Sequence, residues 1–462
     1  MMTGRSCNLI LTQEKFLEIS MKKFIANTVI ASFFMIANAF ALIEIDITEG
    51  NREPFPIAIS DFFYDEADFS KLNEISNNLS DVVKADLERC GLFVPINEDA
   101  FIQKNSAMHL RPRFEDWRLI KSQALVTGKL KIVDGDKLRV EFRLWDTLAE
   151  KEIEALVLIT TLDNWRRISH MISDKVYERL TGEKGYFDTR ILYVSESGPK
   201  NKRIKKLAIM DQDSANHRHL TSGKELVLTP RFNPVKQEIT YLSYFKNLPR
   251  VYLLNIETGN QEVVGDFPGM TFAPRFSPDG SKIIMSLAKD GNSDIYVMDL
   301  KSRVVTRLTT NSAIDTSPSY SPNGKKITFN SDRGGSQQIY VMDNDGRNQK
   351  RISNKGGNYA TPVWSPRGDL IAFTKNFKGS YAIGVMRTNG EGERLLTENW
   401  YQEAPSWSPN GRVLTFYRET PANDAGQGHS STLWSIDLTG FNERKIDTPQ
   451  DGSDPSWSNL LQ

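Results

Sequence analysis

The stretch from Ser317 to Asp343 reads SPSYSPNGKKITFNSDRGGSQQIYVMD, and it nearly copies a stretch that lies 44 residues earlier. That earlier stretch, Ala273 to Asp299, reads APRFSPDGSKIIMSLAKDGNSDIYVMD. Each copy holds a Pro-x-aromatic-Ser anchor, an Asn-Gly or Asp-Gly pair and two alternating apolar runs. Asn-Gly and Asp-Gly supply the positive φ angles of tight hairpins, so each copy is predicted to contain paired β-strands. A unit that recurs at a fixed spacing indicates a repeat architecture.

The anchor occurs six times, at spacings of 44, 44, 44, 43 and 50 residues. The six anchors are Pro230-Arg-Phe-Asn233, Pro274-Arg-Phe-Ser277, Pro318-Ser-Tyr-Ser321, Pro362-Val-Trp-Ser365, Pro405-Ser-Trp-Ser408 and Pro455-Ser-Trp-Ser458. A complete unit contains four predicted strands in about 40 residues, which is typical of a β-propeller blade.

The two ends of the repeat region predict how the ring closes. No strand pattern follows the anchor at Pro455, whereas the runs Ile191–Val194 and Leu207–Met210 have no anchor before them. One blade is therefore predicted to take its innermost strand from the C-terminal region and its other strands from the start of the repeat region. Residues 183–462 then form a six-bladed β-propeller that leaves no open sheet edge. An open β-solenoid does not predict this split.

Residues 42–182 carry no repeat and are predicted to form a small α/β domain, which makes the chain a two-domain α+β protein. Apolar residues lie on one face of a helix over Leu72–Leu87 and of a second helix over Trp165–Leu180. Asp163 is predicted to cap the second helix and Gly182 to end it. The predicted strands cover 124–133, 138–145 and 153–161.

The first 41 residues have the layout of a secretory signal peptide. Met21-Lys22-Lys23 is a basic start, residues 24–36 are mostly apolar, and Ala39-Phe40-Ala41 is a small-x-small cleavage pattern. Cleavage near Ala41 is predicted, with export to the periplasm. Residues 1–20 are interpreted as an upstream extension from a wrongly chosen start codon or as a long basic region. A membrane anchor is the alternative, although the apolar run is short for a bilayer span.

The composition excludes several classes of function. Lys plus Arg equals Asp plus Glu, at 58 each, so no basic surplus indicates nucleic-acid binding. No Gly-x-Ser-x-Gly elbow, phosphate-binding Gly loop or metal-ligand spacing is present, so no catalytic residue, metal or cofactor is predicted. The chain is expected not to be an enzyme. The alternative is a propeller-type periplasmic hydrolase or lyase with an unrecognised site in the channel.

The residues just before the anchors are predicted to surround one mouth of the propeller channel, which suits the binding of proteins. Their apolar, aromatic and small polar character is typical of an interface core. The candidate binding residues are Met270, Phe272, Ala273, Asp315, Thr316, Tyr359, Thr361 and Glu403. The alternative for Phe272 and Tyr359 is that they fill the junctions between blades. The alternating segment Leu42–Thr48 is predicted to be either an ordinary first strand or an arm that adds to a partner's sheet.

A signal peptide, a small α/β domain and a six-bladed ring whose blades read FSPDGSKI and IYVMD resemble the TolB family of the Tol-Pal system. The resemblance covers residues 42–462. It implies a non-enzymatic periplasmic protein that reaches membranes only through partners. These partners are the lipoprotein Pal, the protein TolA and other Tol proteins, and the system supports outer-membrane integrity and invagination during cell division.

The resemblance also assigns residues. The family's contacts with Pal at Ala and Thr positions fall on Ala273 and Thr316, and a His position falls on Met270, which lacks a titratable group. The family's flexible arm maps on Leu42–Asn51, which favours the arm over the ordinary strand. The residues implied to contact TolA are Leu42, Ile43, Glu44, Ile45, Asp46 and Ile47.

Overall fold

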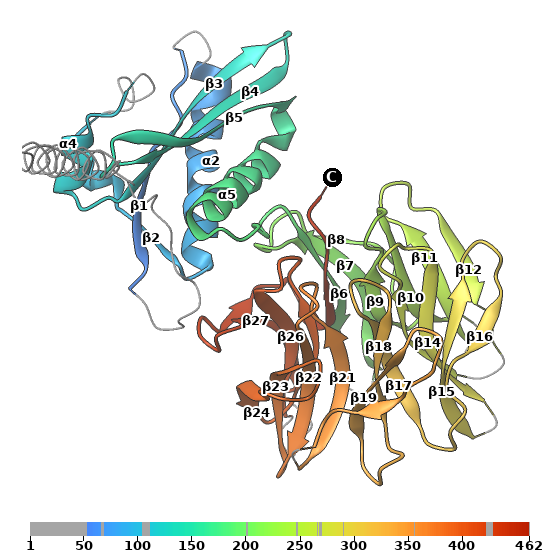
Figure 1. Ribbon diagram of the computed structural model, residues 1–462. Coiled ribbons are helices and arrows are strands. Elements are labelled where there is room, and N and C mark those ends of the chain that lie inside the picture. Colours follow the sequence, from blue (N-terminus) through green and yellow to red (C-terminus); the bar gives the residue numbers. More distant parts are fainter. Residues whose placement is uncertain are drawn as a thin grey trace, which may run out of the picture. The chain divides into compact units, whose positions relative to one another are not determined.

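The computed structural model, shown in Figure 1, places a helix-and-sheet domain before a ring of sheets. It describes residues 53–65, 69–103, 111–199, 202–245, 248–265, 267, 270–289, 291–354, 356–421 and 428–461. The predicted signal peptide, residues 1–41, and the predicted arm, residues 42–51, lie outside this range. Among the helices that it describes, none is both long and apolar enough to cross a membrane.

The N-terminal domain is a five-stranded mixed sheet packed against two long helices. The strand order is β2-β1-β3-β4-β5, with β1 parallel to both neighbours and β3, β4 and β5 antiparallel. Helices α2 and α5 contact each other and the sheet, while a short helix, α4, shares a buried cluster with strands β1, β3 and β4. The elements are β1 (Phe55–Ile59), α2 (Phe69–Arg89), β2 (Phe93–Pro95), α4 (Phe114–Leu119), β3 (Ala124–Val133), β4 (Lys137–Asp146), β5 (Lys151–Thr161) and α5 (Trp165–Thr181).

The predicted helices and the three predicted strands of this domain are confirmed, but one predicted cap is wrong. Asp163 lies inside a 3₁₀ turn, Leu162–Asn164, so the N-cap position of α5 falls on Asn164, whose side chain makes no capping hydrogen bond. Gly182 ends α5 as predicted, with a φ of 72° that glycine adopts without steric cost. Strands β1 and β2 and helix α4 were not predicted.

The ring consists of six four-stranded antiparallel sheets, as predicted. The first blade is split, because β29 from the C-terminal region pairs with β6. From the innermost strand outward, the first blade is β29 (Asp451–Trp457), β6 (Arg190–Ser197), β7 (Ile204–Asp211) and β8 (Arg218–His219), and the second blade is β9 (Val227–Phe232), β10 (Glu238–Phe245), β11 (Leu248–Asn255) and β12 (Gln261–Gly265). The third blade is β13 (Met270–Phe276), β14 (Lys282–Lys289), β15 (Asn292–Asp299) and β16 (Val305–Arg307), and the fourth blade is β17 (Asp315–Tyr320), β18 (Lys326–Ser331), β19 (Gln338–Asp343) and β20 (Lys350–Arg351). The fifth blade is β21 (Asn358–Trp364), β22 (Leu370–Phe377), β23 (Ser380–Arg387) and β24 (Arg394–Asn399), and the sixth blade is β25 (Gln402–Trp407), β26 (Val413–Thr420), β27 (Ser430–Asp437) and β28 (Arg444–Ile446).

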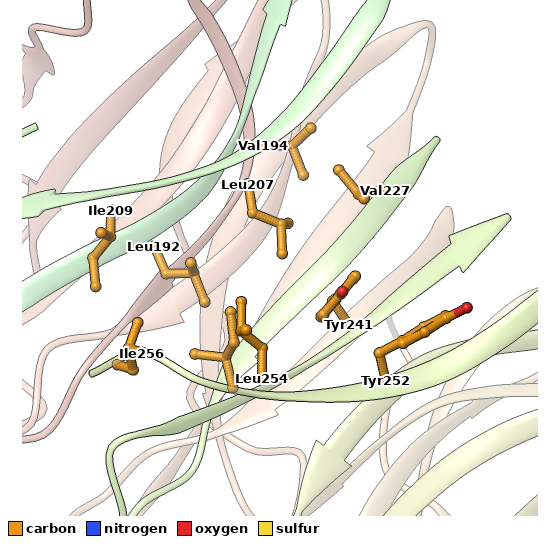
Figure 2. Packing of buried hydrophobic residues seen from close by; sticks show 10 residues of the cluster. Leu192, Val194, Leu207, Ile209, Val227, Tyr241, Tyr252, Leu254 and Ile256 are labelled. Carbon is orange, nitrogen blue, oxygen red and sulfur yellow. The ribbon is translucent and has the colours of Figure 1, made fainter. Parts of the chain in front are cut away.

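Apolar side chains fill the space between each pair of adjacent blades, and six such clusters complete the circle. Figure 2 shows the cluster between the first two blades, where Leu192 and Leu207 face Tyr241 and Leu254. Successive residues of a strand point to opposite faces of a sheet, so each blade supplies both of its neighbours. Burial of these side chains, at about 25 cal/mol per Å² of apolar surface, is the main force that holds the ring together.

The innermost strand of every blade carries the same backbone irregularity. The pairing with the second strand shifts register just before the anchor proline in all six blades. The residue before that proline has a positive φ between 46° and 58°, although none is glycine. These residues are Thr229, Ala273, Ser317, Thr361, Ala404 and Asp454. Such a β-bulge bends the strand and re-aims its side chains, so the bulge belongs to the architecture of the channel wall.

Candidate functional site

The antiparallel pairing of the blades defines two ends of the central channel. At the strand-start end the innermost strands begin; Asp315, the first residue of β17, pairs there with Ser331, the last residue of β18. At the hairpin end the innermost strands finish, and in five of the six blades a hairpin leads into the second strand, in three of them through an Asn-Gly or Asp-Gly pair. The eight candidate binding residues all lie in the first half of an innermost strand, and thus toward the strand-start end.

The carboxylate of Asp315 is buried and neutralised within the protein. Arg333, from the turn that follows β18, donates from Nη2 to both carboxylate oxygens, at 3.0 and 2.8 Å. The Arg333 guanidinium also lies over the Tyr340 ring, 4.9 Å from its centroid. The Asp315 side chain is fully buried, so its role in this conformation is to order the turn that borders the mouth.

The Tyr359 side chain is fully buried in the cluster between the fourth and fifth blades, where it packs on Phe373. Its hydroxyl donates to Glu393 at 2.8 Å, and the ammonium of Lys375 lies 4.8 Å from its ring centroid. The structure therefore favours the alternative for this residue: Tyr359 fills a junction between blades, while its carbonyl accepts a hydrogen bond from Asn330.

Glu403 and Thr361 are half-buried beside the bulges of their strands. Glu403 accepts a hydrogen bond from the Tyr401 hydroxyl at 2.6 Å, and burial raises the pKa of its carboxyl group. The Thr361 hydroxyl lies 2.9 Å from that of Thr374 on the second strand. Both side chains have partners inside the ring and still expose part of their surface to the mouth.

The remaining candidates come from two adjacent blades. Phe272 and Ala273 are half-buried in β13, and Thr316 is half-buried in β17, one residue before the bulge. Met270 begins β13, and its side chain lies outside the described residues. Ala273 and Thr316 thus occupy nearly equivalent positions on neighbouring strands, so a single partner at the strand-start end can touch both.

Two exposed apolar residues beside this mouth were missing from the predicted set. Ile314 directly precedes β17 and is 46% exposed, and Trp400 precedes β25 and is 52% exposed. An exposed tryptophan at the rim of a concavity is a common anchor of protein interfaces. Its signal was present in the sequence, because Trp400 lies next to the loop Tyr401–Ala404 that we predicted to border the mouth.

A second polar cluster joins the helices of the N-terminal domain to the first blade. The buried Asp86 of α2 lies 2.7 Å from Nδ1 of His170 of α5 and accepts a hydrogen bond at 2.8 Å from Gln212, which follows β7. Asp213 of the same turn pairs with Arg166 of α5. Asp86, His170 and Asp213 lie close enough together to share a metal ion.

Existing contacts match the charges of these groups, although Nε2 of His170 is buried without a hydrogen bond. Arg89 donates to Asp86 at 2.8 Å. Although burial opposes ionisation, His170 and Arg89 hold the pKa of Asp86 below its ordinary value. Because arginine and histidine already match the charge of the carboxylates, the cluster is best described as a polar network between α2, α5 and the first blade.

Comparison with known proteins identifies the family. The chain is a two-domain propeller protein, in which a small α/β domain precedes a six-bladed ring and a polar network links the two. The model of the TolB amino-terminal domain matches residues 43–153, and the model of the TolB beta propeller domain matches residues 177–461. The chain belongs to the TolB family of Tol-Pal system proteins.

Two relatives cover nearly the whole chain. The protein named Tol-Pal system protein TolB from Pelagibacter ubique (strain HTCC1062) is 68% identical over 429 residues, which are 92% of this chain and 96% of that protein. The crystal structure of TolB from Acinetobacter baumannii is 30% identical and has a TM-score of 0.77. The match covers 90% of this chain and 99% of the Acinetobacter baumannii chain, so the two proteins share the two-domain organisation.

Proposed function

We propose that this chain is a periplasmic, non-enzymatic component of the Tol-Pal system that binds Pal at the strand-start end of the propeller channel. The observation that carries the proposal is its 68% identity, over 92% of the chain, to a Tol-Pal system protein. Export through a signal peptide cleaved near Ala41 is part of the proposal.

The geometry of the mouth supports a binding role. Ala273 and Thr316 lie half-buried on adjacent strands, with Ile314 exposed beside them. The nearby charged groups of Asp315 and Glu403 are already bonded inside the ring. A partner therefore meets a surface of apolar and small polar groups, which needs little desolvation of charge.

We further propose that residues 42–51, including Leu42–Ile47, bind TolA, and that this arm and the Pal site are coupled. Coupling of two sites requires that each ligand change the affinity for the other by the same factor. In the cell, this coupling between the Pal site and the TolA-binding arm supports outer-membrane integrity and invagination during division.

The test is calorimetric titration of residues 42–462 with soluble Pal, alongside Thr316→Arg. The substitution puts a long cation on the mouth and is expected to abolish binding. Thr258→Arg, at an exposed turn between β11 and β12, is the matched control and is expected to bind as the wild type does. If both variants still bound Pal, or if both lost Pal binding, the placement of the site would be contradicted.

Deletion of residues 42–51 tests the arm separately. The shortened chain is expected to retain Pal binding and to lose TolA binding, measured by the same titration. Unchanged TolA binding would show that the arm is not the TolA site, without bearing on the Pal site.

A further inference from the structure

The channel wall differs between blades at one repeated position, the residue between the proline and the aromatic residue of each anchor. These six residues occupy equivalent register positions on the innermost strands. In ring order from β9 they are Arg231, Arg275, Ser319, Val363, Ser406 and Ser456.

The three serines join neighbouring blades. The hydroxyl oxygen of Ser319 accepts from the backbone N–H of Trp364 at 3.3 Å, that of Ser406 accepts from Trp457 at 3.0 Å, and that of Ser456 accepts from Phe232 at 3.4 Å. None of the three hydroxyl groups donates a hydrogen bond to another described residue, so their protons remain available to a ligand.

The two arginines do not join blades in this way. Among the described residues, the guanidinium of Arg231, a residue that is 8% exposed, donates only to the carbonyl of its neighbour Pro230, at 2.6 Å. The side chain of the half-buried Arg275 makes no hydrogen bond to any of the described residues. The Nε atoms of both guanidinium groups are buried without a partner. Over the same residues, no carboxylate lies within ion-pair distance of either side chain.

Two cations in this setting are electrostatically unfavourable. Burial lowers the pKa of both guanidinium groups, and the charge of Arg231 lowers that of Arg275 further. Asp454 is the acidic group whose charge opposes this effect on both arginines. A charge that is taken out of water without a partner destabilises the folded chain, so its presence indicates a compensating ligand or function.

A cavity of about 360 Å³ opens onto these side chains at the hairpin end of the channel. Both arginines and the three serines line it, together with prolines of the hairpins and the aromatic anchor residues. The cavity is large enough for a small molecule or for one side chain of a partner. It lies at the opposite end of the innermost strands from the candidate residues of the Pal site.

We propose that the hairpin end of the channel is an oxyanion-binding site formed by Arg231 and Arg275, with the hydroxyl groups of Ser319, Ser406 and Ser456 as further donors. Guanidinium groups present paired N–H donors whose spacing matches the oxygens of carboxylate and phosphate groups. Two adjacent guanidinium groups favour a ligand that carries two negative charges. Phosphate groups and dicarboxylates share this chemistry.

The experiment is isothermal titration of the purified chain with inorganic phosphate and, separately, with succinate, in a buffer free of other oxyanions and at constant ionic strength. Saturable binding of at least one is expected. Arg275→Gln is expected to weaken it about tenfold or more, because it removes a charge-assisted contact. Tighter binding of phosphate would indicate a phosphate-bearing ligand, and tighter binding of succinate would indicate carboxylates such as those of an acidic peptide.

Three further variants make the test specific. Arg231→Gln is expected to weaken binding as Arg275→Gln does, and Asp454→Asn to strengthen it by removing a competing negative charge. Arg347→Gln makes the same charge change at a 79% exposed side chain in the turn after β19 and is expected to have no effect. Absence of binding by both anions, or equal binding by wild type and Arg275→Gln, would overturn the proposal.

Discussion

The two ends of the propeller channel treat buried charge in opposite ways. At the strand-start end, Asp315 is bonded through both carboxylate oxygens to Arg333, and Glu403 accepts from Tyr401. At the hairpin end, Arg231 and Arg275 have no acidic partner within ion-pair distance among the described residues. Matched charges shape the loops of one mouth, whereas unmatched charges at the other mouth indicate that something outside the chain completes them. The comparison assigns a structural role to the paired charged side chains of the strand-start end and a ligand-binding role to the unpaired arginines of the hairpin end.

The largest effect is expected from breaking the matched pair. Asp315→Ala leaves the guanidinium of Arg333, 16% exposed, without its carboxylate. Loss of one partner of a buried pair costs about 3–5 kcal/mol, and the partial exposure of Arg333 favours the lower end. The free energy of unfolding, from denaturant titration followed by tryptophan fluorescence, is the measurement.

Glu262→Ala is the control for this prediction. Glu262 pairs with Arg303 at 3.1 Å, but both side chains are largely exposed, so a loss below about 1 kcal/mol is expected. Equal losses in the two variants would show that the Asp315 pair is no stronger than a surface pair.

The polar network between the helical domain and the first blade contains a pair, His170 and Asp86, whose contribution to stability is expected to depend on pH. Burial alone would lower the pKa of His170, but Asp86, and more weakly Asp213 and Asp211, raise it above its ordinary value. A histidine with a raised pKa in the folded state stabilises fully below about pH 6.5, and this contribution disappears as the pH rises through the folded pKa. His170→Asn is expected to cost about 1–3 kcal/mol at pH 6 and less at pH 9.

The informative quantity is the difference in unfolding free energy between wild type and His170→Asn, measured from pH 6 to pH 9. This difference removes the contribution of other groups, such as Asp174, whose pKa burial raises to about 7. A difference that stays constant with pH would mean that folding leaves the pKa of His170 unchanged.

The unmatched end of the channel predicts a change of opposite sign. Arg275→Ser gives the junction between the third and fourth blades the residue that Ser319 supplies at the equivalent position of the next junction. We expect the chain without ligand to gain about 1 kcal/mol, because a half-buried unpaired charge is removed and a hydrogen-bond acceptor for the next blade is added. Thermal unfolding in oxyanion-free buffer measures the effect.

Ser319→Ala is the matched control, because it removes the acceptor of the Trp364 N–H. A loss of about 1 kcal/mol is expected. If Arg275→Ser instead destabilised the chain, the guanidinium would have to contribute to the empty ring, and the argument from unmatched charge would fail.

Much of the fold was predictable because the ring repeats a local signal. Five of the six anchors precede a hairpin that joins the innermost strand to the second strand, and the incomplete units at the two ends predicted the split first blade. The N-terminal domain gave weaker signals at β1 and β2. Their pairing is parallel and joins segments that are far apart in sequence, so no turn motif marks them. Asp163 and Asn164 are both favourable capping residues, and their order alone does not decide between them.

The site was less predictable, because burial is decided by three-dimensional neighbours. Asp315 begins β17, but its partner Arg333 lies in the turn after β18, so the sequence did not indicate that this carboxylate is buried and paired. Tyr359 precedes the bulge at Thr361, and strand alternation there points its side chain into the blade junction, which the sequence did not reveal. The arginine pair was visible as Pro-Arg-Phe in two consecutive anchors, yet only the ring brings both side chains to one cavity. It also shows that none of the described carboxylates lies within ion-pair distance of them.

The smallest expected effect concerns the bulges that both ends share. Ala404 has a φ of 58°, a conformation that costs a non-glycine residue roughly 1–2 kcal/mol, whereas Ala372, in the second strand of its blade, is not among the residues with positive φ. Glycine loses more chain entropy on folding, which costs about 0.5–1 kcal/mol in a strand. Ala404→Gly is therefore expected to leave stability unchanged or raise it by about 0.5 kcal/mol, and Ala372→Gly to lower it by about 1 kcal/mol. Both alanines are buried, so unfolding titrations of the two variants compare backbone conformation rather than exposure. Equal destabilisation would mean that the bulge is relaxed, and the strain would then have no part in shaping the channel wall.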